Sequence, residues 1–458
     1  MRKIWPGFLL AILVFHFGNA QNTQSFEEEE LAFERAYELF NKSKFNSARS
    51  AFDKLIQVSN NEIAIESRYY SALSGLYLFH PDAINDLRNF QNKYPQHPLS
   101  KGINFELGKY YYQKGDFPEA ANYLRKVDYG SLSSEESTEA QFKLAYSLFT
   151  KQDFEDAKPL FDNVKGGAHK YSNAACYYSG IIAYKNSNYE QAEKDFKRAS
   201  ADDSYRLLTP ELFANIYYKQ RRYDDLEEIG QEVIANKGVR NKANIYMILA
   251  DSYYERKNYS KAKEYFDEYM KGRRSAPIPD IAYRIGFCDF QLGDYEQSIP
   301  MLNQAALRGN DSIIQMASFY LGQVHLKSEN IAYAETAFET ASRSDINQDV
   351  KEESFFALAK LKFDSKLRAQ SIDLFQEYIK DYPEGKYFDD ANRYLSEAFL
   401  TSNNYDAAIN HIEKIENKSR VILETYQKVT FFKGVENFNN SEFEEAIANF
   451  DKSLQHDF

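Results

Sequence analysis

The segment GDYEQSIPMLNQA (residues 293–305) sets the pattern on which the fold depends. It contains an aromatic residue, a small residue three positions later and a bulky apolar residue four positions after that. Three other segments follow the same order: QDFEDAKPLFDNV (152–164), SNYEQAEKDFKRA (187–199) and KNYSKAKEYFDEY (257–269). A pattern that returns at long, regular intervals predicts a repeat architecture, in which one structural unit is stacked many times.

We use the aromatic residue, or the residue that replaces it, as the marker of each repeat. Markers recur twelve times at intervals of 34 to 38 residues, a period typical of solenoids. They are Phe45, His80, Phe117, Phe154, Tyr189, Tyr223, Tyr259, Tyr295, Ile331, Arg368, Tyr405 and Phe443. The second repeat (near 61–97) and the tenth (near 350–384) diverge most, so we expect these two to be degenerate.

Each repeat is predicted to contain two helices. A small residue lies nine positions before the marker, and on the second helix a small residue lies three positions after it and a large one seven after it. These spacings place each set on one helix face. The small residue lets two antiparallel helices approach closely, and stacking on the next repeat buries the apolar face that one pair leaves open. On the first helices the small residues are Ala36, Gly108, Ala145, Gly180, Ala214, Ala250, Gly286, Gly322, Ala359 and Gly434.

This pattern resembles the tetratricopeptide repeat (TPR). The matching residues are Gly286, Gly293, Tyr295, Ser298, Leu302 and Ala305 in one repeat, and Gly108, Tyr111, Gly115, Phe117, Ala120 and Leu124 in another. The resemblance covers about residues 27–458. It implies an all-α, TPR-type α-solenoid, a right-handed superhelix of about twelve helix-turn-helix repeats.

The first twenty residues form a separate segment. Arg2 and Lys3 precede the apolar run FLLAILVF (8–15), and the small residues Gly18 and Ala20 follow it. This order predicts a secretory signal peptide over residues 1–20 that is cleaved after Ala20, leaving the TPR superhelix at 21–458. An uncleaved anchor is the alternative. Together with the repeats, the segment resembles large exported bacterial TPR proteins, which implies a periplasmic or outer-membrane-associated location.

Composition narrows the possible partners. The net charge is −12, which disfavours nucleic acid, because phosphate binding requires a basic surface. After signal cleavage we expect no membrane-spanning segment. Cys176 and Cys288 lie three repeats apart, too far for a disulfide, so we expect two separate buried thiols.

No enzyme motif stands out. GINFELGK (102–109) resembles a phosphate loop, but its glycines are one residue too far apart and no Ser or Thr follows the lysine. The histidines are scattered over different repeats, and none has a partner at metal-ligand spacing. We therefore expect neither catalysis nor a cofactor nor a metal site.

In TPR proteins ligands usually lie in the concave groove that the first helices line. The resemblance therefore directs attention to residues one position beyond the core face of these helices. The candidate groove residues are Tyr112, Phe149, Tyr184, Asn215, Tyr218, Tyr254 and Phe290. Their rings either pack between neighbouring first helices or line a peptide-binding groove, and both roles can hold in part. Glu211 stands where the family's carboxylate clamp has lysine, four residues before Asn215, so binding of chaperone C-terminal tails is not expected.

We expect a non-enzymatic scaffold of the periplasm or cell envelope that binds partner proteins or peptides in this groove. One alternative is a regulatory or adaptor N-terminal part of a longer protein, since the last repeat (441–454) lacks an extra polar-faced helix. The other alternative is a groove that binds glycan or peptidoglycan through its tyrosines.

Overall fold

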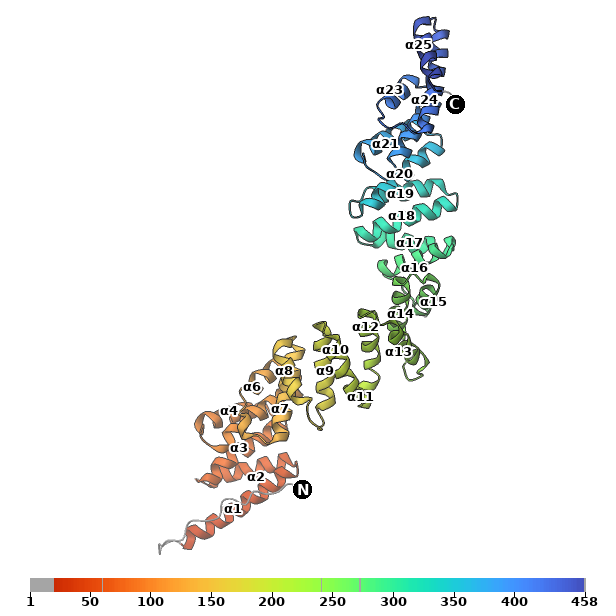
Figure 1. The fold of residues 1–458 in the computed structure, drawn as a ribbon. Helices are drawn as coiled ribbons and strands as arrows, with labels where there is room; N and C mark the ends of the chain where they lie inside the picture. The colour runs from red at the N-terminus through yellow and green to blue at the C-terminus, as the bar shows by residue number, and fades with distance from the viewer. Residues whose placement is uncertain (1–19, 60, 240, 272, 457–458) are drawn as a thin grey trace. The chain divides into compact units, whose positions relative to one another are not determined.

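The computed structural model describes residues 20–59, 61–239, 241–271 and 273–456. These residues form α-helices joined by short turns, with two short 3₁₀ helices and no strand among them (Figure 1). The chain divides into two compact units, one ending at Gln220 and one beginning at Arg221. The predicted all-α class is therefore confirmed, and each unit is an α-solenoid built from pairs of helices.

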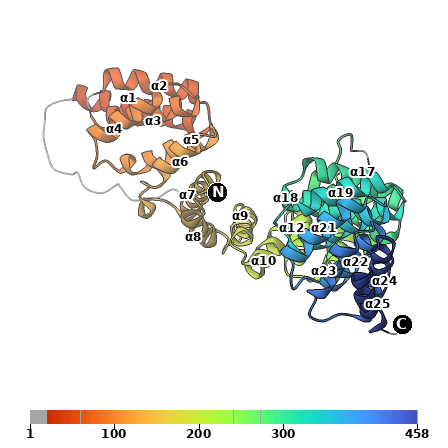
Figure 2. The same cartoon turned by 90° about the horizontal axis from the view of Figure 1, so that it is seen from above.

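Among the described residues, and setting aside the short α11, the first unit contains five helix pairs and one further first helix, α12. Its helices are α1 (Ala20–Asn41), α2 (Phe45–Val58), α3 (Glu62–Tyr77), α4 (Ala83–Lys93), α5 (Ile103–Gln113), α6 (Phe117–Leu124), α7 (Ser134–Thr150), α8 (Phe154–Val164), α9 (Ser172–Lys185), α10 (Tyr189–Ala199), α11 (Asp203–Arg206) and α12 (Thr209–Lys219), with η1 (Pro98–Gly102) and η2 (Tyr129–Ser131). The unit boundary follows α12 directly. Within this unit α1 and α2 lie side by side, as do α5 and α6 (Figure 2).

The second unit continues the alternation of first and second helices. Its helices are α13 (Tyr223–Ala235), α14 (Ala243–Glu255), α15 (Tyr259–Met270), α16 (Pro279–Leu292), α17 (Tyr295–Arg308), α18 (Asp311–Lys327), α19 (Ile331–Ser342), α20 (Gln348–Asp364), α21 (Arg368–Asp381), α22 (Phe388–Thr401), α23 (Tyr405–Glu413), α24 (Arg420–Asn439) and α25 (Phe443–Leu454). Each helix contacts its neighbours in the chain, as expected for a solenoid.

The predicted marker is the first residue of the second helix in eleven repeats. The exception is the second repeat, where α4 begins at Ala83, three residues after His80. Pro81 and Asp82 intervene, and the Arg49 guanidinium contacts both the His80 ring and the Asp82 carboxylate there. In the tenth repeat, α20 and α21 keep the same frame as the other helix pairs, and Phe375 is completely buried.

A left-handed residue ends most first helices, two positions before the marker. At Gln152, φ is +63°, and the Gln152 N–H donates to the Phe149 carbonyl at 2.9 Å. The next residue, Asp153, donates to the Leu148 carbonyl at 2.9 Å, which completes a Schellman motif. The corresponding residues elsewhere are Ser43, Gly115, Ser187, Arg221, Lys257, Gly293, Glu329, Lys366, Asn403 and Ser441. The motif sets the same tight turn in these repeats even though glycine occupies only two of the positions.

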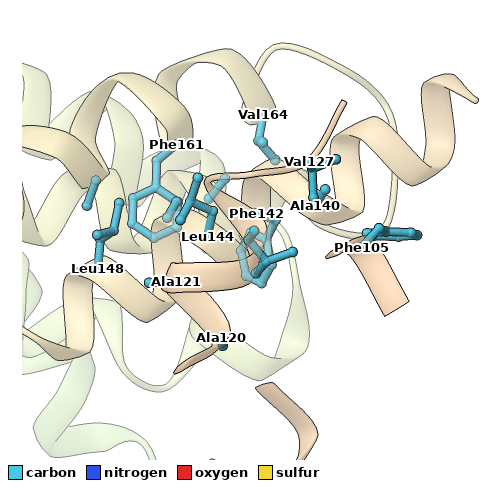
Figure 3. Close-up of a cluster of buried hydrophobic side chains, with 14 of the residues drawn as sticks. Phe105, Ala120, Ala121, Val127, Ala140, Phe142, Leu144, Leu148, Phe161 and Val164 are labelled. Carbon is cyan, nitrogen blue, oxygen red and sulfur yellow. The ribbon is translucent and has the colours of Figure 1, made fainter. Parts of the chain in front are cut away.

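Small and large residues meet where the two helices of a repeat cross. A Cβ added to Gly286 would lie 2.8 Å from Leu302 Cγ and 3.0 Å from the Leu302 backbone nitrogen. A Cβ on Gly322 would lie 2.6 Å from the ring of Phe338. Figure 3 shows a core of this kind in the first unit, where Phe161 lies against first-helix side chains including Phe142. A Cβ on Gly180 in the first unit would likewise lie 2.7 Å from the ring of Phe196, so the predicted close approach is present in both units.

The repeat at the start of the second unit reverses the order of sizes. On α13 the large residue, Leu226, lies three positions after the marker and the small one, Gly230, lies seven after it. A Cβ on Gly230 would lie 2.9 Å from Leu249 Cδ1 of α14. The Leu249 side chain, from the following first helix, therefore packs directly against this glycine. A small residue of this second helix thus still allows a close helix contact, but the contact is with the next first helix, α14, instead of the first helix of the same repeat.

Both cysteines are free and buried, which confirms the predicted separate thiols. Burial raises the pKa of the Cys288 thiol to about 12. Within the described ranges, no helix combines the length and apolar character needed to cross a bilayer. Residues 1–19, which carry most of the predicted signal peptide, lie outside the described residues, and α1 begins at Ala20.

One carboxylate is buried in the second unit. Asp289 on α16 is only 2% exposed, and the Lys263 ammonium lies 3.5 Å from its Oδ1. Burial raises the pKa of Asp289 to about 6, while Lys263 opposes the shift. Because the native pKa lies above the unfolded value of about 3.9, ionisation of Asp289 destabilises the fold.

The Gly286→Leu variant tests the helix crossing. We expect the added side chain to overpack Leu302 and to lower the free energy of unfolding by about 1–3 kcal/mol, measured by urea denaturation. Gly166→Leu is the control, because the only atom within 4 Å of an added Cβ there is the Asn163 carbonyl oxygen at 3.7 Å. Equal stability of Gly286→Leu and wild type would show that the helices do not cross at this residue.

The Asp289→Asn variant tests the buried carboxylate. The wild-type free energy of unfolding should fall relative to this variant by about 2–3 kcal/mol as pH rises from about 4 to about 6.5, and stay level above that. Asp224→Asn serves as the control, because Asp224 is exposed on α13 and takes no part in the Lys263–Asp289 contact. Urea denaturation at several pH values measures the difference, and a constant difference across the range would contradict the buried, uncharged form.

Candidate functional site

The aromatic stripe is the name we give to the predicted groove residues Tyr112, Phe149, Tyr184, Asn215, Tyr218, Tyr254 and Phe290. All seven are partly buried, and they lie near the C-terminal ends of first helices. The first five belong to the first unit and the last two to the second, so each unit carries its own part of the stripe.

Tyr112 on α5 shows how these rings are held. Its ring centroid lies 5.7 Å from that of the marker Phe117 and 5.6 Å from that of Tyr146 on the next first helix, α7. The Lys143 ammonium lies 5.0 Å from the centre of the Tyr112 ring, within the range of a cation–π contact. Burial raises the pKa of Tyr112, so its hydroxyl stays protonated at neutral pH.

Phe149 on α7 repeats this arrangement one helix pair later. Its ring centroid lies 5.5 Å from that of the marker Phe154 and 5.1 Å from that of Tyr178 on α9. Tyr184 contacts its own marker, Tyr189, at 5.7 Å. Tyr112, Phe149 and Tyr184 therefore each contact the marker of their own repeat, and Tyr112 and Phe149 also contact the following first helix.

Asn215 and Tyr218 on α12 are placed differently. The Asn215 amide donates to the Glu211 carbonyl at 2.8 Å, one turn back on its own helix. The Lys219 ammonium lies 6.0 Å from the centre of the Tyr218 ring. A carboxylate clamp needs a lysine where Glu211 stands, so the structure leaves Asn215 without that partner.

In the second unit, the stripe combines rings with charge. The ring centroid of Tyr254 lies 5.8 Å from that of Phe287, and the Arg284 guanidinium lies 5.8 Å from the centre of the Tyr254 ring. Arg284 also pairs with Asp251 at 2.7 Å and with Asp280 at 3.1 Å. Burial raises the pKa of Asp251, and the nearby Arg284 guanidinium opposes that shift.

Phe290 lies in the same cluster. Its ring centroid is 6.1 Å from that of its marker, Tyr295, and 5.1 Å from that of Tyr320 on α18. Phe287 and Tyr320 lie 4.7 Å apart, nearly edge to face. The result is a cluster of packed aromatic rings next to a paired arginine.

The second set of rings was not among the predicted site residues. Tyr146, Tyr178, Phe287 and Tyr320 each lie on the next first helix and contact a stripe ring. A signal for them exists in the sequence, because each lies eight or eleven positions before its own marker. The packing between first helices that we considered beside the groove is therefore present, and the stripe rings themselves remain partly exposed.

A histidine and two carboxylates meet in the first unit, although sequence spacing separates them. Ligand-type atoms of Glu62, Glu66 and His97 lie within 4.8 Å of one another. The Leu99 N–H donates to His97 Nδ1 at 3.2 Å, which leaves the ring proton on Nε2, 2.7 Å from Glu62 Oε1. A protonated Nε2 offers no lone pair to a metal, so this group is a hydrogen-bonded pair beside a second carboxyl.

The family comparison agrees with the repeat pattern. A tetratricopeptide repeat model matches residues 105–168 and 289–348, and a second model of that repeat matches residues 245–271. No curated protein matches the sequence.

The chain is also similar, at a low level, to several solved structures. One is the C-terminal part of a TPR repeat-containing protein from Cytophaga hutchinsonii, with 15% identity, a TM-score of 0.44, and coverage of 54% of this chain and 97% of that one. PilF of Pseudomonas aeruginosa has 16% identity and a TM-score of 0.38 over 48% of this chain and 96% of its own. A Naa15/Naa10 complex with HypK-THB has 13% identity and a TM-score of 0.41 over 93% and 68%. Similarities at this level carry no inference about partners.

The matched segments 105–168, 245–271 and 289–348 lie on helix pairs whose markers, turns and small–large crossings follow one plan. These segments are tetratricopeptide repeats, so the chain contains several copies of this repeat.

Proposed function

We propose that this chain is a non-enzymatic scaffold of the bacterial periplasm or cell envelope that binds partner proteins through the aromatic stripe. TPR proteins bind other proteins and are generally not catalytic, which supports the scaffold role. The stripe adds a surface of the right chemistry: partly exposed rings held in place by their neighbours, which lose little conformational freedom when a partner binds.

The cluster around Tyr254 and Phe290 is the observation that carries the proposal. In this cluster the stripe rings Tyr254 and Phe290 pack against Phe287 and Tyr320. Arg284 lies next to the Tyr254 ring, and its guanidinium is oriented by an ion pair with Asp251. Aromatic and arginine side chains are enriched among interface residues that dominate binding energy. The ordered ion pair means that little further reorganisation is needed on binding.

Paired variants test the stripe. Tyr254→Ala and Phe290→Ala should each weaken binding of a partner captured by cross-linking from the envelope fraction, by roughly tenfold or more for a hot-spot residue. Tyr265→Ala is the matched control, because Tyr265 is a half-buried tyrosine on the second helix α15 of the same repeat as Tyr254. Titration of the purified partner by calorimetry gives the affinities.

Two results would count against this assignment. If Tyr254→Ala and Phe290→Ala both bind the partner with unchanged affinity, the partner does not bind at the aromatic stripe. Saccharide binding that is lost in Tyr218→Ala and Tyr254→Ala, without affinity for any protein, would favour the glycan-binding alternative.

Export is supported by Arg2, Lys3, the apolar run at 8–15 and the small residues before position 21. We expect the protein recovered from its native host to begin at Gln21, as measured by intact mass. A chain that retains residues 1–20 and is found in the cytoplasm would contradict export, and one that retains them in the membrane fraction would favour the anchor.

A further inference from the structure

A cavity of about 240 Å³ in the second unit lies outside the aromatic stripe. Its walls come from the second helices α17 and α19, and its floor comes from the first helix α18 between them. It is smaller than the roughly 300–1,000 Å³ pockets that hold drug-sized ligands, so its size fits one side chain of a partner.

Two large apolar side chains face solvent at the rim of this cavity. Leu307 on α17 is 81% exposed and Tyr333 on α19 is 68% exposed. Both residues line the same cavity. Large apolar side chains that stand together in water at one opening mark an interaction surface.

The Tyr333 position shows that this rim departs from the repeat pattern. Tyr333 lies two positions after its marker, where the other repeats carry no aromatic residue. Their residues at that position are Ser47, Asp82, Glu119, Asp156, Gln191, Asp225, Lys261, Gln297, Gln370, Ala407 and Glu445. The repeat fold therefore does not require an aromatic ring here.

The floor of the cavity provides a polar group that lacks a partner. His325 is 9% exposed, and its Nδ1 is buried without a hydrogen bond. Its ring stacks on Tyr333, with centroids 5.2 Å apart. The hydroxyls of Thr336 and Thr340 donate to carbonyls of their own helix at 3.1 and 2.9 Å. A buried, unpaired nitrogen carries a desolvation cost that a hydrogen-bonding ligand would remove.

Burial also lowers the pKa of His325, so the imidazole is neutral at neutral pH and has one nitrogen able to accept a hydrogen bond. A second cavity of about 360 Å³, lined by Arg343 and Ile346 among others, shares Thr340 with the first. The two cavities adjoin along α19, which leaves room for peptide backbone beside an inserted side chain.

We propose that the cavity between α17 and α19 is a docking pocket for one tryptophan or tyrosine side chain of a partner protein. The ring packs against Leu307 and Tyr333, and its N–H or O–H group donates to His325. Tryptophan and tyrosine combine a large apolar body with one donor, which matches an apolar rim above a buried acceptor. This pocket is separate from the aromatic stripe, so its test is independent of the proposed function.

Fluorine NMR on the full chain tests the pocket with two capped pentapeptides. One carries 5-fluorotryptophan between glycine pairs, and the other carries 4-fluorophenylalanine, which has no donor. We expect the tryptophan peptide to bind roughly three- to tenfold more tightly, the ratio that one hydrogen bond provides. Equal affinities, or binding of free indole in preference to the peptide, would overturn the proposal.

Variants locate the binding. His325→Leu should remove the preference for tryptophan, while Tyr333→Ala and Leu307→Ala should weaken both peptides. Tyr333 and Leu307 are exposed, so these two variants should retain the wild-type melting temperature and keep the test valid if His325→Leu is unstable.

The control is His411→Leu. His411 also has a buried nitrogen without a partner, but it lies on α23, outside this cavity. Its replacement should change neither affinity. Unchanged binding in all three pocket variants would refute the docking pocket.

Discussion

The crossing of two helices at a small residue is the constraint from which the rest of the structure follows. At Gly286 and Gly322 there is no room for even a methyl group beside Leu302 and Phe338. This proximity lets a large side chain fill the groove between antiparallel helices. A pair built in this way is still apolar on its outer face, so the next pair must cover it. The recurrence of the pattern is therefore a packing requirement, and it leads to an elongated solenoid in each unit.

The turn between the helices is the second requirement, and it explains why the first helices end in register. The backbone N–H groups of the left-handed residue and of the residue after it donate to the last carbonyls of the first helix, as at Gln152 and Asp153. With the turn geometry constant, five stripe rings contact the marker that lies five positions after them: Tyr112, Phe149, Tyr184, Tyr254 and Phe290. Stripe rings such as Tyr112 and Phe290 are therefore positioned by the same turn that pairs the helices.

Sequence reasoning reached the helix pairs, the first residue of most second helices and the small–large contacts, because these depend on short-range spacing. It did not reach features that depend on neighbouring repeats. Before the late start of α4, Arg49 of the preceding repeat contacts His80 and Asp82, and the Glu62–His97 contact joins residues 35 positions apart. The left-handed turn residues could not be predicted from the sequence, because glycine, the residue that usually indicates this conformation, occupies only two of these positions. The partners Tyr146 and Tyr320 depend on how one first helix faces the next, which spacing within a repeat does not specify.

A double-mutant cycle on Gly286 and Leu302 tests the central constraint most directly. Urea denaturation of wild type, Gly286→Ala, Leu302→Ala and the double variant gives the coupling free energy. If the two residues occupy one crossing, Leu302→Ala makes space for the new methyl group, and the double variant is more stable than the sum of the single changes predicts by about 0.5–3 kcal/mol. Additive effects, with no coupling between the two positions, would contradict the close crossing on which the repeat depends.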